Sequence, residues 1–208
     1  MGSAAKGELH VPDHTQTVRR HFSASREVIE AVLADEGVIA SICEIAARLE
    51  RCLRAGGKIL LAGNGGSAAD ALHIAGELVG RLYFDRAPLP AIALAANAAV
   101  LTALGNDYGF EQVFERQVRA LGRPGDALIA LSTSGRSPNI LTAVAAAKEL
   151  GLVTIAFTGA GSGPLASACD LALRVPSTAT PLIQQVHMAA AHAICEIVEA
   201  ALCGGQRS

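Results

Sequence analysis

The sequence of 208 residues contains no tryptophan, and aromatic residues make up only 3% of it. A core without large rings must be built from Ala, Leu, Ile and Val. Apolar residues are 51% of the chain and charged residues 17%, which excludes a disordered chain and predicts a globular protein. An Ala-rich chain with so little charge also predicts an oligomer that covers helix faces. The length favours one well-buried domain over two.

The chain also lacks a basic segment. The net charge is −2, and Lys and Arg are scattered, which argues against a nucleic-acid partner. The five cysteines show no CxxC spacing, so we interpret them as reduced core residues rather than disulfide partners or metal ligands. No apolar run reaches transmembrane length, and the polar first residues do not resemble a signal peptide. We therefore expect a cytoplasmic protein without membrane contact.

The chain organisation follows from its hydrophobic periodicity. Residues 1–14 have none, which predicts a flexible N-terminus ahead of a single domain, residues 15–208. Apolar residues then recur at helical spacing over 16–34 and 38–53, two helices that are candidates for packing against partner subunits. Beyond them strands and helices alternate. The predicted strands are 58–62, 91–95, 126–131, 153–157 and 171–175, and the predicted helices are 68–82, 98–104, 111–120, 139–150 and 181–202.

The predicted strands are continuous apolar runs, which is typical of a parallel sheet covered on both faces. Together with the alternation of strands and helices, they predict an α/β fold with a doubly wound five-stranded parallel sheet and two N-terminal helices. Ligands of such sheets bind beyond the carboxyl ends of the strands. Two polar loops, residues 64–67 and 132–137, lie on this rim.

The first loop leaves its strand through Gly63-Asn64-Gly65-Gly66 and enters an Ala-rich helix. Glycine allows a sharp turn or a close approach to a ligand, Ser67 is a suitable N-cap, and a helix start favours an anion. The loop also fits the dinucleotide pattern G-x-G-x-x-A. The next strand, however, ends in Ala96-Asn97 instead of the acidic residue that holds a ribose. A tight turn without a ligand is the plainer alternative.

The second loop is Ser132-Thr133-Ser134-Gly135-Arg136-Ser137, followed by Pro138 at a predicted helix start. Its four hydroxyls and the helix N-terminus make a set of donors suited to a phosphate monoester. The alternative is an ordinary Ser/Thr-rich capping loop. Two such loops at neighbouring strand ends favour phosphate binding.

Candidate acid–base residues lie on two helices. His73 and Glu77 are four residues apart and share one helix face. On the last helix, Gln184 and His192 are about 80° apart on the wheel, whereas His187 is about 140° from His192 and is placed elsewhere. Imidazole and carboxylate ligands suit zinc, although a carboxamide ligand is unusual. A histidine on an Ala-rich helix can equally be a satisfied core residue.

These motifs resemble the sugar isomerase (SIS) domain, and closely the phosphoheptose isomerases, over about residues 16–202. Five separated matches carry the resemblance: Asn64–Asp70, His73-x-x-x-Glu77 with Gly80-Arg81, Gly105–Tyr108, Ser132–Ser137, and Ile183-Gln184 ahead of His192. The resemblance implies a flavodoxin-like SIS fold. It also implies an aldose–ketose isomerase that converts sedoheptulose 7-phosphate to D-glycero-D-manno-heptose 7-phosphate. That reaction begins ADP- or GDP-heptose synthesis for lipopolysaccharide or other surface glycans.

The resemblance also implies site residues and partners. Glu77 matches the base that acts on carbon and His192 the acid that acts on oxygen, in a homotetramer with active sites at subunit interfaces. One zinc ion per subunit would be held by His73, Glu77, Gln184 and His192. The implied substrate-binding residues are Asn64, Gly65, Ser67, Arg81, Asn97, Ser132, Thr133, Ser134, Ser137 and Gln184. A metal ligand is not a free base unless its coordination changes, so the catalytic role of the metal is left open.

Two departures from the family bear on substrate choice. Many relatives carry Asp where this chain has Asn97, and the segment before Gln184 often contains an Asp that residues 177–181 lack. A second interpretation is a non-catalytic SIS scaffold of the replication-initiator-associating type, which typically lacks the residues matching Glu77 and His192. A third is a sugar-phosphate sensor, for which the N-terminal segment is too short and not basic. The presence of Glu77 and His192 favours the isomerase.

Overall fold

The computed structural model describes residues 14–161 and 163–204. Its first helix, α1 (His14–Ala34), already includes the last residue of the predicted flexible segment 1–14; the rest of that segment lies outside the described residues. The division of the chain into a terminus and one domain stays a prediction.

Five strands form one parallel sheet in the order β2-β1-β3-β4-β5, which confirms the predicted doubly wound fold. The strands are β1 (Ile59–Gly63), β2 (Ala91–Ala93), β3 (Ala127–Leu131), β4 (Val153–Gly159) and β5 (Leu171–Val175). The order reverses between β1 and β3, whose residues pair in register from Ile59 with Ala127 onward. Both strands are buried along their whole length, which explains their continuous apolar runs. A ligand site is expected where the order reverses.

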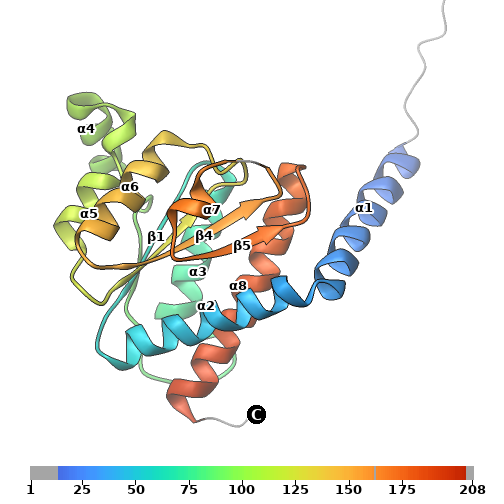
Figure 1. Cartoon of the computed structure of the whole chain (residues 1–208), viewed down its shortest axis with the longest axis horizontal. Coiled ribbons are helices and arrows are strands. Elements are labelled where there is room, and N and C mark those ends of the chain that lie inside the picture. The colour runs from blue at the N-terminus through green and yellow to red at the C-terminus, as the bar shows by residue number, and fades with distance from the viewer. Residues whose placement is uncertain (1–13, 162, 205–208) are drawn as a thin grey trace, which may run out of the picture.

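Helices cover both faces of the sheet (Figure 1). Alternate residues of each strand point to opposite faces, so Leu61 joins one hydrophobic core and Leu60 the other. The first core is closed by α2 (Glu36–Arg54), α3 (Gly66–Val79) and α8 (Thr180–Cys203). The second is closed mainly by α5 (Glu115–Leu121), α6 (Pro138–Glu149) and α7 (Leu165–Ala168). The site described below lies on the α3 and α8 side.

Helix α8 is the only described helix whose length and composition would allow it to cross a membrane. It instead packs against α2 and α3, with Ile183, Ile194 and Val198 among its buried residues. This burial accounts for its apolar composition as that of a core helix.

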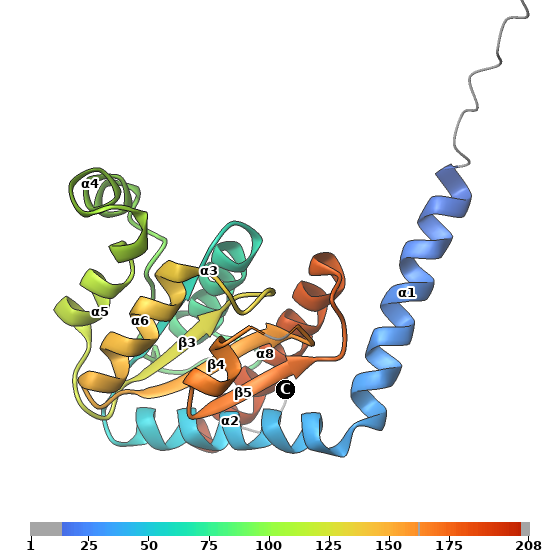
Figure 2. The same ribbon diagram turned by 45° about the horizontal axis from the view of Figure 1, so that its top comes forward.

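The two N-terminal helices differ in what they cover. Helix α2 begins after Asp35, whose side chain accepts hydrogen bonds from the N–H groups of Gly37 and Val38, and its apolar face packs on α8 and β5. The apolar side chains of α2 therefore belong to the core of this chain, and packing of α2 against a partner subunit stays a prediction. Helix α1 extends away from the sheet (Figure 2) and leaves Phe22 70% and Leu33 65% exposed.

One predicted helix is wrong. Residues 111–120 form a short 3₁₀ turn, η1 (Phe110–Gln112), followed by α5, because Val113 and Phe114 turn into the second core. Helix α7 was not predicted, because its four residues are too few to show a periodic pattern. The other elements match their predicted ranges to within four residues at each end, and α4 (Ala98–Tyr108) is the longest extension.

The cysteines are all free, as predicted, but not all lie in the core. Cys52 and Cys195 are buried, and desolvation raises the pKa of Cys52 to about 11. Cys43 and Cys203 are exposed, which corrects the expectation for these two. Their positions on the outer surfaces of α2 and α8 explain the difference.

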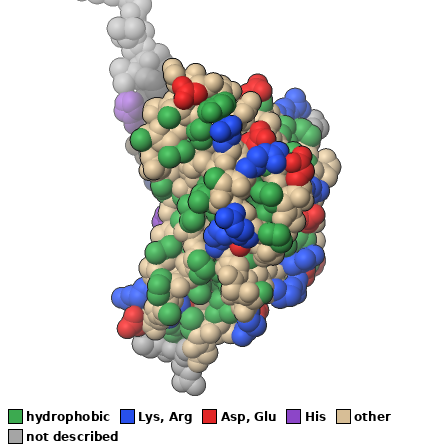
Figure 3. Space-filling view, turned by 90° about the vertical axis from the view of Figure 1, so that its left-hand side faces the viewer, with side chains coloured by type: hydrophobic (Ala, Val, Ile, Leu, Met, Phe, Trp, Pro, Cys, Tyr) green, Lys and Arg blue, Asp and Glu red, His purple; other side chains and the backbone are tan. Residues whose placement is uncertain are grey.

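The side of the molecule that carries α4 and α5 shows acidic and basic side chains set among apolar ones (Figure 3). Arg119 illustrates the mixture, since it pairs with Glu115 at 2.9 Å and with Glu149 at 2.9 Å. The guanidinium of Arg116 stacks on the ring of Tyr108 at 3.7 Å.

Candidate active site

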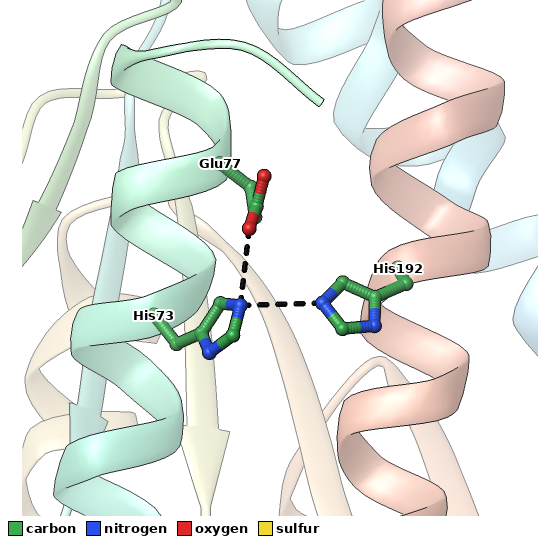
Figure 4. A group of neighbouring side chains, drawn as sticks. All are labelled: His73, Glu77 and His192. Atoms are coloured by element: carbon green, nitrogen blue, oxygen red, sulfur yellow. Dashed lines mark hydrogen bonds and ion pairs between the residues drawn. The ribbon is translucent and has the colours of Figure 1, made fainter. Parts of the chain in front are cut away.

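Three titratable side chains converge between α3 and α8 (Figure 4). His73 Nε2 lies 3.0 Å from Glu77 Oε1 and 3.2 Å from His192 Nε2. The ligating atoms of the three residues all lie within 4.8 Å of one another. The structure thus brings together residues that are 115 and 119 positions apart in the chain.

Helices α3 and α8 pack against each other and share the first core. Helix α3 contributes Ile74 and Leu78 to it, and α8 contributes Ala191 beside His192. His73 and Glu77 stand one turn apart at this interface, with side chains 50% and 22% exposed. The group is therefore reachable from solvent on one side and held by the core on the other.

The donor set fits a divalent metal. An N–H at His73 Nε2 can be aimed at only one of its two neighbours, the Glu77 oxygen or the His192 nitrogen. A cation between the three groups would instead accept a lone pair from each. Two imidazole nitrogens and a carboxylate oxygen are ligands that zinc accepts in catalytic sites.

Gln184 lies nearer the start of α8 than the His73–Glu77–His192 group does. A Cβ on Gly66 would meet the Gln184 amide, so this side chain rests on the first turn of α3. It precedes His192 by eight residues, about 12 Å along the axis of α8. Among the described residues no hydrogen bond joins Gln184 to the His73–Glu77–His192 group, and the predicted four-ligand set stays a prediction.

His187 points away from this group, as its helical position predicts. It is fully buried, its ring packs against Phe157, and its Nε2 lies 3.3 Å from the carbonyl oxygen of Thr158. Burial lowers the pKa of His187 to about 4, so the ring is neutral at physiological pH.

The loop after β1 is built around glycine. Gly65 has φ 53°, a left-handed conformation that side chains disfavour, and it caps α3, which begins at Gly66. The expectation that Ser67 is the N-cap is therefore wrong: Ser67 is buried inside the first turn. Asn64 exchanges two hydrogen bonds of 2.9 Å with Asn139 of α6, a buried residue that sequence analysis missed.

The loop after β3 gathers hydroxyl groups. Ser132 Oγ lies 3.1 Å from Ser137 Oγ and 3.5 Å from Ser134 Oγ. Ser137 occupies the N-cap position of α6 but makes no capping bond through its side chain, which argues against a simple capping loop. Thr133 Oγ1 lies 3.4 Å from Thr180 Oγ1 at the start of α8. This loop, residues 132–137, is called the serine loop below, and it borders the helix that carries His192.

Two further predicted residues lie at the margins. Arg81 is exposed just beyond α3. Asn97 is the N-cap of α4, and its side chain accepts the N–H of Val100 at 3.1 Å. Helix capping accounts for Asn97, and its contact with a substrate stays a prediction.

Comparisons with known proteins agree with this geometry. The SIS domain model matches residues 20–159. The phosphoheptose isomerase of Rhodospirillum rubrum is 58% identical over 163 residues, which are 78% of this chain and 87% of that protein. The phosphoheptose isomerase of Burkholderia pseudomallei is 49% identical over 91% of this chain and 96% of that protein. The structure of phosphoheptose isomerase GmhA from Neisseria gonorrhoeae superposes with a TM-score of 0.84 at 41% identity, covering 89% of this chain and 98% of that one. The chain therefore belongs to the phosphoheptose isomerases of the SIS domain family.

Proposed function

We propose that this chain is an aldose–ketose isomerase that converts sedoheptulose 7-phosphate into D-glycero-D-manno-heptose 7-phosphate. The observation that carries the proposal is the convergence of Glu77 and His192, from α3 and α8, of which α8 begins beside the serine loop. The relatives named phosphoheptose isomerase support the substrate class.

The proposed reaction moves a carbonyl group from C2 to C1. Glu77 removes a proton from C1 while His192 donates one to the oxygen at C2, which gives an enediol. The proton held by Glu77 then returns to C2, and His192 takes the proton of the C1 hydroxyl, which leaves the aldehyde. Each acid–base group contributes typically ~100- to 10,000-fold to the rate.

The serine loop is assigned to the phosphate group. Ser132, Ser134 and Ser137 point their hydroxyls toward one another at the start of α6, so a phosphate can accept hydrogen bonds from this set. Thr133 adds a fourth hydroxyl on the side of α8. Binding energy from this distant end of the substrate would hold the reacting carbons in place.

We assign zinc as the cofactor, held by His73, Glu77 and His192 with Gln184 as a fourth ligand. When bound, the ion would polarise the carbonyl group and stabilise the oxygens of the enediolate. A coordinated carboxylate is not free to take a proton. Activity that survives chelation would therefore support Glu77 as the base, and activity that requires the metal would support Glu77 as a ligand.

The exposed apolar side chains of α1 support a homotetramer. Val18 and Phe22 are 55% and 70% exposed, far more than large apolar residues of a core helix. We propose that a second copy of the chain covers them, and that the enzyme acts in the cytoplasm at the first step of heptose activation. Phe22→Asp should then shift the sedimentation coefficient toward that of smaller species, and an unchanged coefficient would oppose this assignment.

The non-catalytic scaffold is not favoured, since the scaffold proteins typically lack both residues that meet in this site, Glu77 and His192. The decisive experiment is NMR analysis of the protein incubated with sedoheptulose 7-phosphate, with and without a chelator. An aldose product with the expected configuration at C2 supports the proposal. An unchanged ketose in both samples, with folded protein and added zinc, would overturn it.

A further inference from the structure

A second group of buried charges lies beside the proposed active site. Arg86 follows α3 in the connection to β2, and Glu199 lies near the end of α8. Their side chains are only 3% and 1% exposed, and Arg86 Nε donates to Glu199 Oε1 at 2.8 Å. Charged side chains are almost never fully buried unless they are paired, and the burial of even a pair costs desolvation free energy. The position of this pair therefore needs an explanation.

The guanidinium of Arg86 holds the end of α3. Its Nη2 donates to the carbonyl oxygen of Glu77 and its Nη1 to that of Leu78, both at 2.8 Å. Carbonyl groups in the last turn of a helix have no N–H partner within the helix. Arg86 thus fixes the backbone of the residue whose side chain is the proposed base.

The carboxylate of Glu199 holds the segment that leaves α3. It accepts hydrogen bonds from the backbone N–H groups of Leu82 at 3.0 Å, Tyr83 at 2.7 Å and Phe84 at 3.2 Å. Burial alone would raise the pKa of Glu199, but these N–H groups and Arg86 lower it below its ordinary value. Glu199 is therefore ionised at neutral pH, with each of its oxygens bonded.

Glu199 also lies on the same helix as the second catalytic candidate. It follows His192 by seven residues, which is two turns and a rotation of about 20°, so both face the same side of α8. The hydrogen bonds lead from the backbone of Glu77 through Arg86 to Glu199 on α8, the helix that also carries His192. This connection crosses the interface that sets the separation of Glu77 from His192.

We propose that Arg86 and Glu199 form a positioning pair, which holds Glu77 at its working distance from His192. The inference rests on the proposed roles of Glu77 and His192. The pair also holds the backbone directly after Arg81, because Glu199 accepts the N–H of Leu82.

The test is Glu199→Gln, matched with Asp126→Asn. Asp126 is likewise a buried carboxylate that accepts from a cation, Lys58, and from backbone N–H groups, but these partners belong to the segments before β1 and β3 and not to α3 or α8. Both variants replace a carboxylate by an amide of the same shape. Since a misplacement of 1 Å can cost about a hundred-fold, we expect kcat of Glu199→Gln to fall about ten- to a hundred-fold. Its KM for sedoheptulose 7-phosphate should hardly change, because the serine loop is untouched.

A second variant keeps the test independent of folding. Arg86→Lys retains the charge but cannot donate to two carbonyls and a carboxylate at once through a planar fork. The kcat of Arg86→Lys should fall less than that of Arg86→Met and more than that of Asp126→Asn. If Arg86→Met does not fold, the folded Arg86→Lys enzyme gives the same comparison with Asp126→Asn.

Glu77→Gln, measured in parallel, separates the two proposals. If Glu77→Gln retains turnover, the proposed role of Glu77 fails, and this inference with it. If Glu77→Gln is inactive while folded Glu199→Gln and Arg86→Lys keep the kcat of Asp126→Asn, only the positioning role is overturned. An equal loss of kcat in Glu199→Gln and Asp126→Asn, or a rise in KM alone, would also overturn it.

Discussion

Two regions of the molecule bond their polar side chains in opposite ways: the amino ends of β1 and β3, and the interface of α3 with α8. At the amino end, Asp126 accepts from Lys58 Nζ and from the backbone N–H groups of Lys58 and Arg123, so its oxygens are fully bonded. Around the interface of α3 with α8, His73 Nε2 is shared between two neighbours, and Asp70 Oδ2 on α3 is buried without a hydrogen-bond partner among the described residues. Burial raises the pKa of Asp70, although the charge of His73 opposes the shift.

The difference distinguishes structural polar groups from functional ones. Buried polar atoms are normally paired, and exceptions need a reason. At the amino end each group has its own partner, which holds strands and loops together. Between α3 and α8 the groups crowd one another around a common point, which is what a ligand or metal requires. Substitutions in the two regions should therefore affect different properties.

The largest difference is expected between Glu77→Gln and Asp126→Asn. Without its carboxylate, Glu77→Gln loses the group that exchanges the carbon proton, so kcat should fall ~100- to 10,000-fold. Circular dichroism and thermal melting should show an intact fold, because Glu77 is partly exposed. A kcat within a few-fold of the parent would contradict the assignment.

His187 tests a polar group that belongs to neither class, since it lies on α8 but is buried in the core. Its pKa is lowered to about 4, so between pH 6.5 and 4 the unfolded state binds the proton and the native state does not. The free energy of unfolding should therefore decrease as the pH is lowered, by about 3 kcal/mol between pH 6.5 and pH 4. Urea denaturation at several pH values measures the effect.

The control for that experiment is His187→Met, which keeps an apolar body but cannot titrate. Its loss of stability between pH 7 and 4 should be smaller than that of the parent by the same amount. Equal slopes for the two proteins would show that the native state binds the proton at His187 as readily as the unfolded chain.

The serine loop gives a smaller effect on binding. Ser134 is exposed and points its hydroxyl toward Ser132, so Ser134→Ala should remove one hydrogen bond to the phosphate. A hydrogen bond to a charged group is worth about 1.5–3 kcal/mol, and KM should rise roughly ten- to a hundred-fold with a smaller change in kcat. Ser167→Ala is the control, because within the described part of the chain its hydroxyl bonds only the carbonyl of Pro164, the residue before α7. An unchanged KM in Ser134→Ala would oppose phosphate binding at this loop.

The sheet and the two rim loops could be predicted from the sequence because each depends on local patterns. The buried run of β1 and the spacing of His73 and Glu77 are visible within a few residues. Contacts made through tertiary packing left no such pattern. Asn139 meets Asn64 across 75 positions, and Arg86 meets Glu199 across 113. The turn into η1 was missed for the same reason, since the core decides where Val113 points.

The smallest effect is expected at the amino end, from Asp126→Asn. The amide keeps one acceptor oxygen but loses the charge that pairs with Lys58, whose side chain is 24% exposed and can turn to solvent. We expect a loss of about 1–3 kcal/mol in the free energy of unfolding, measured by urea denaturation at pH 7.

The pKa of Asp126 is lowered because its hydrogen bonds to Lys58 and Arg123 outweigh burial, which alone would raise it. The stability that the carboxylate contributes is therefore present above its unfolded pKa and is lost as pH falls through its folded pKa, so parent and variant should converge in acid. A variant with parental stability and reduced kcat would place a functional group among the paired residues before β1 and β3, contrary to the distinction drawn between the two regions.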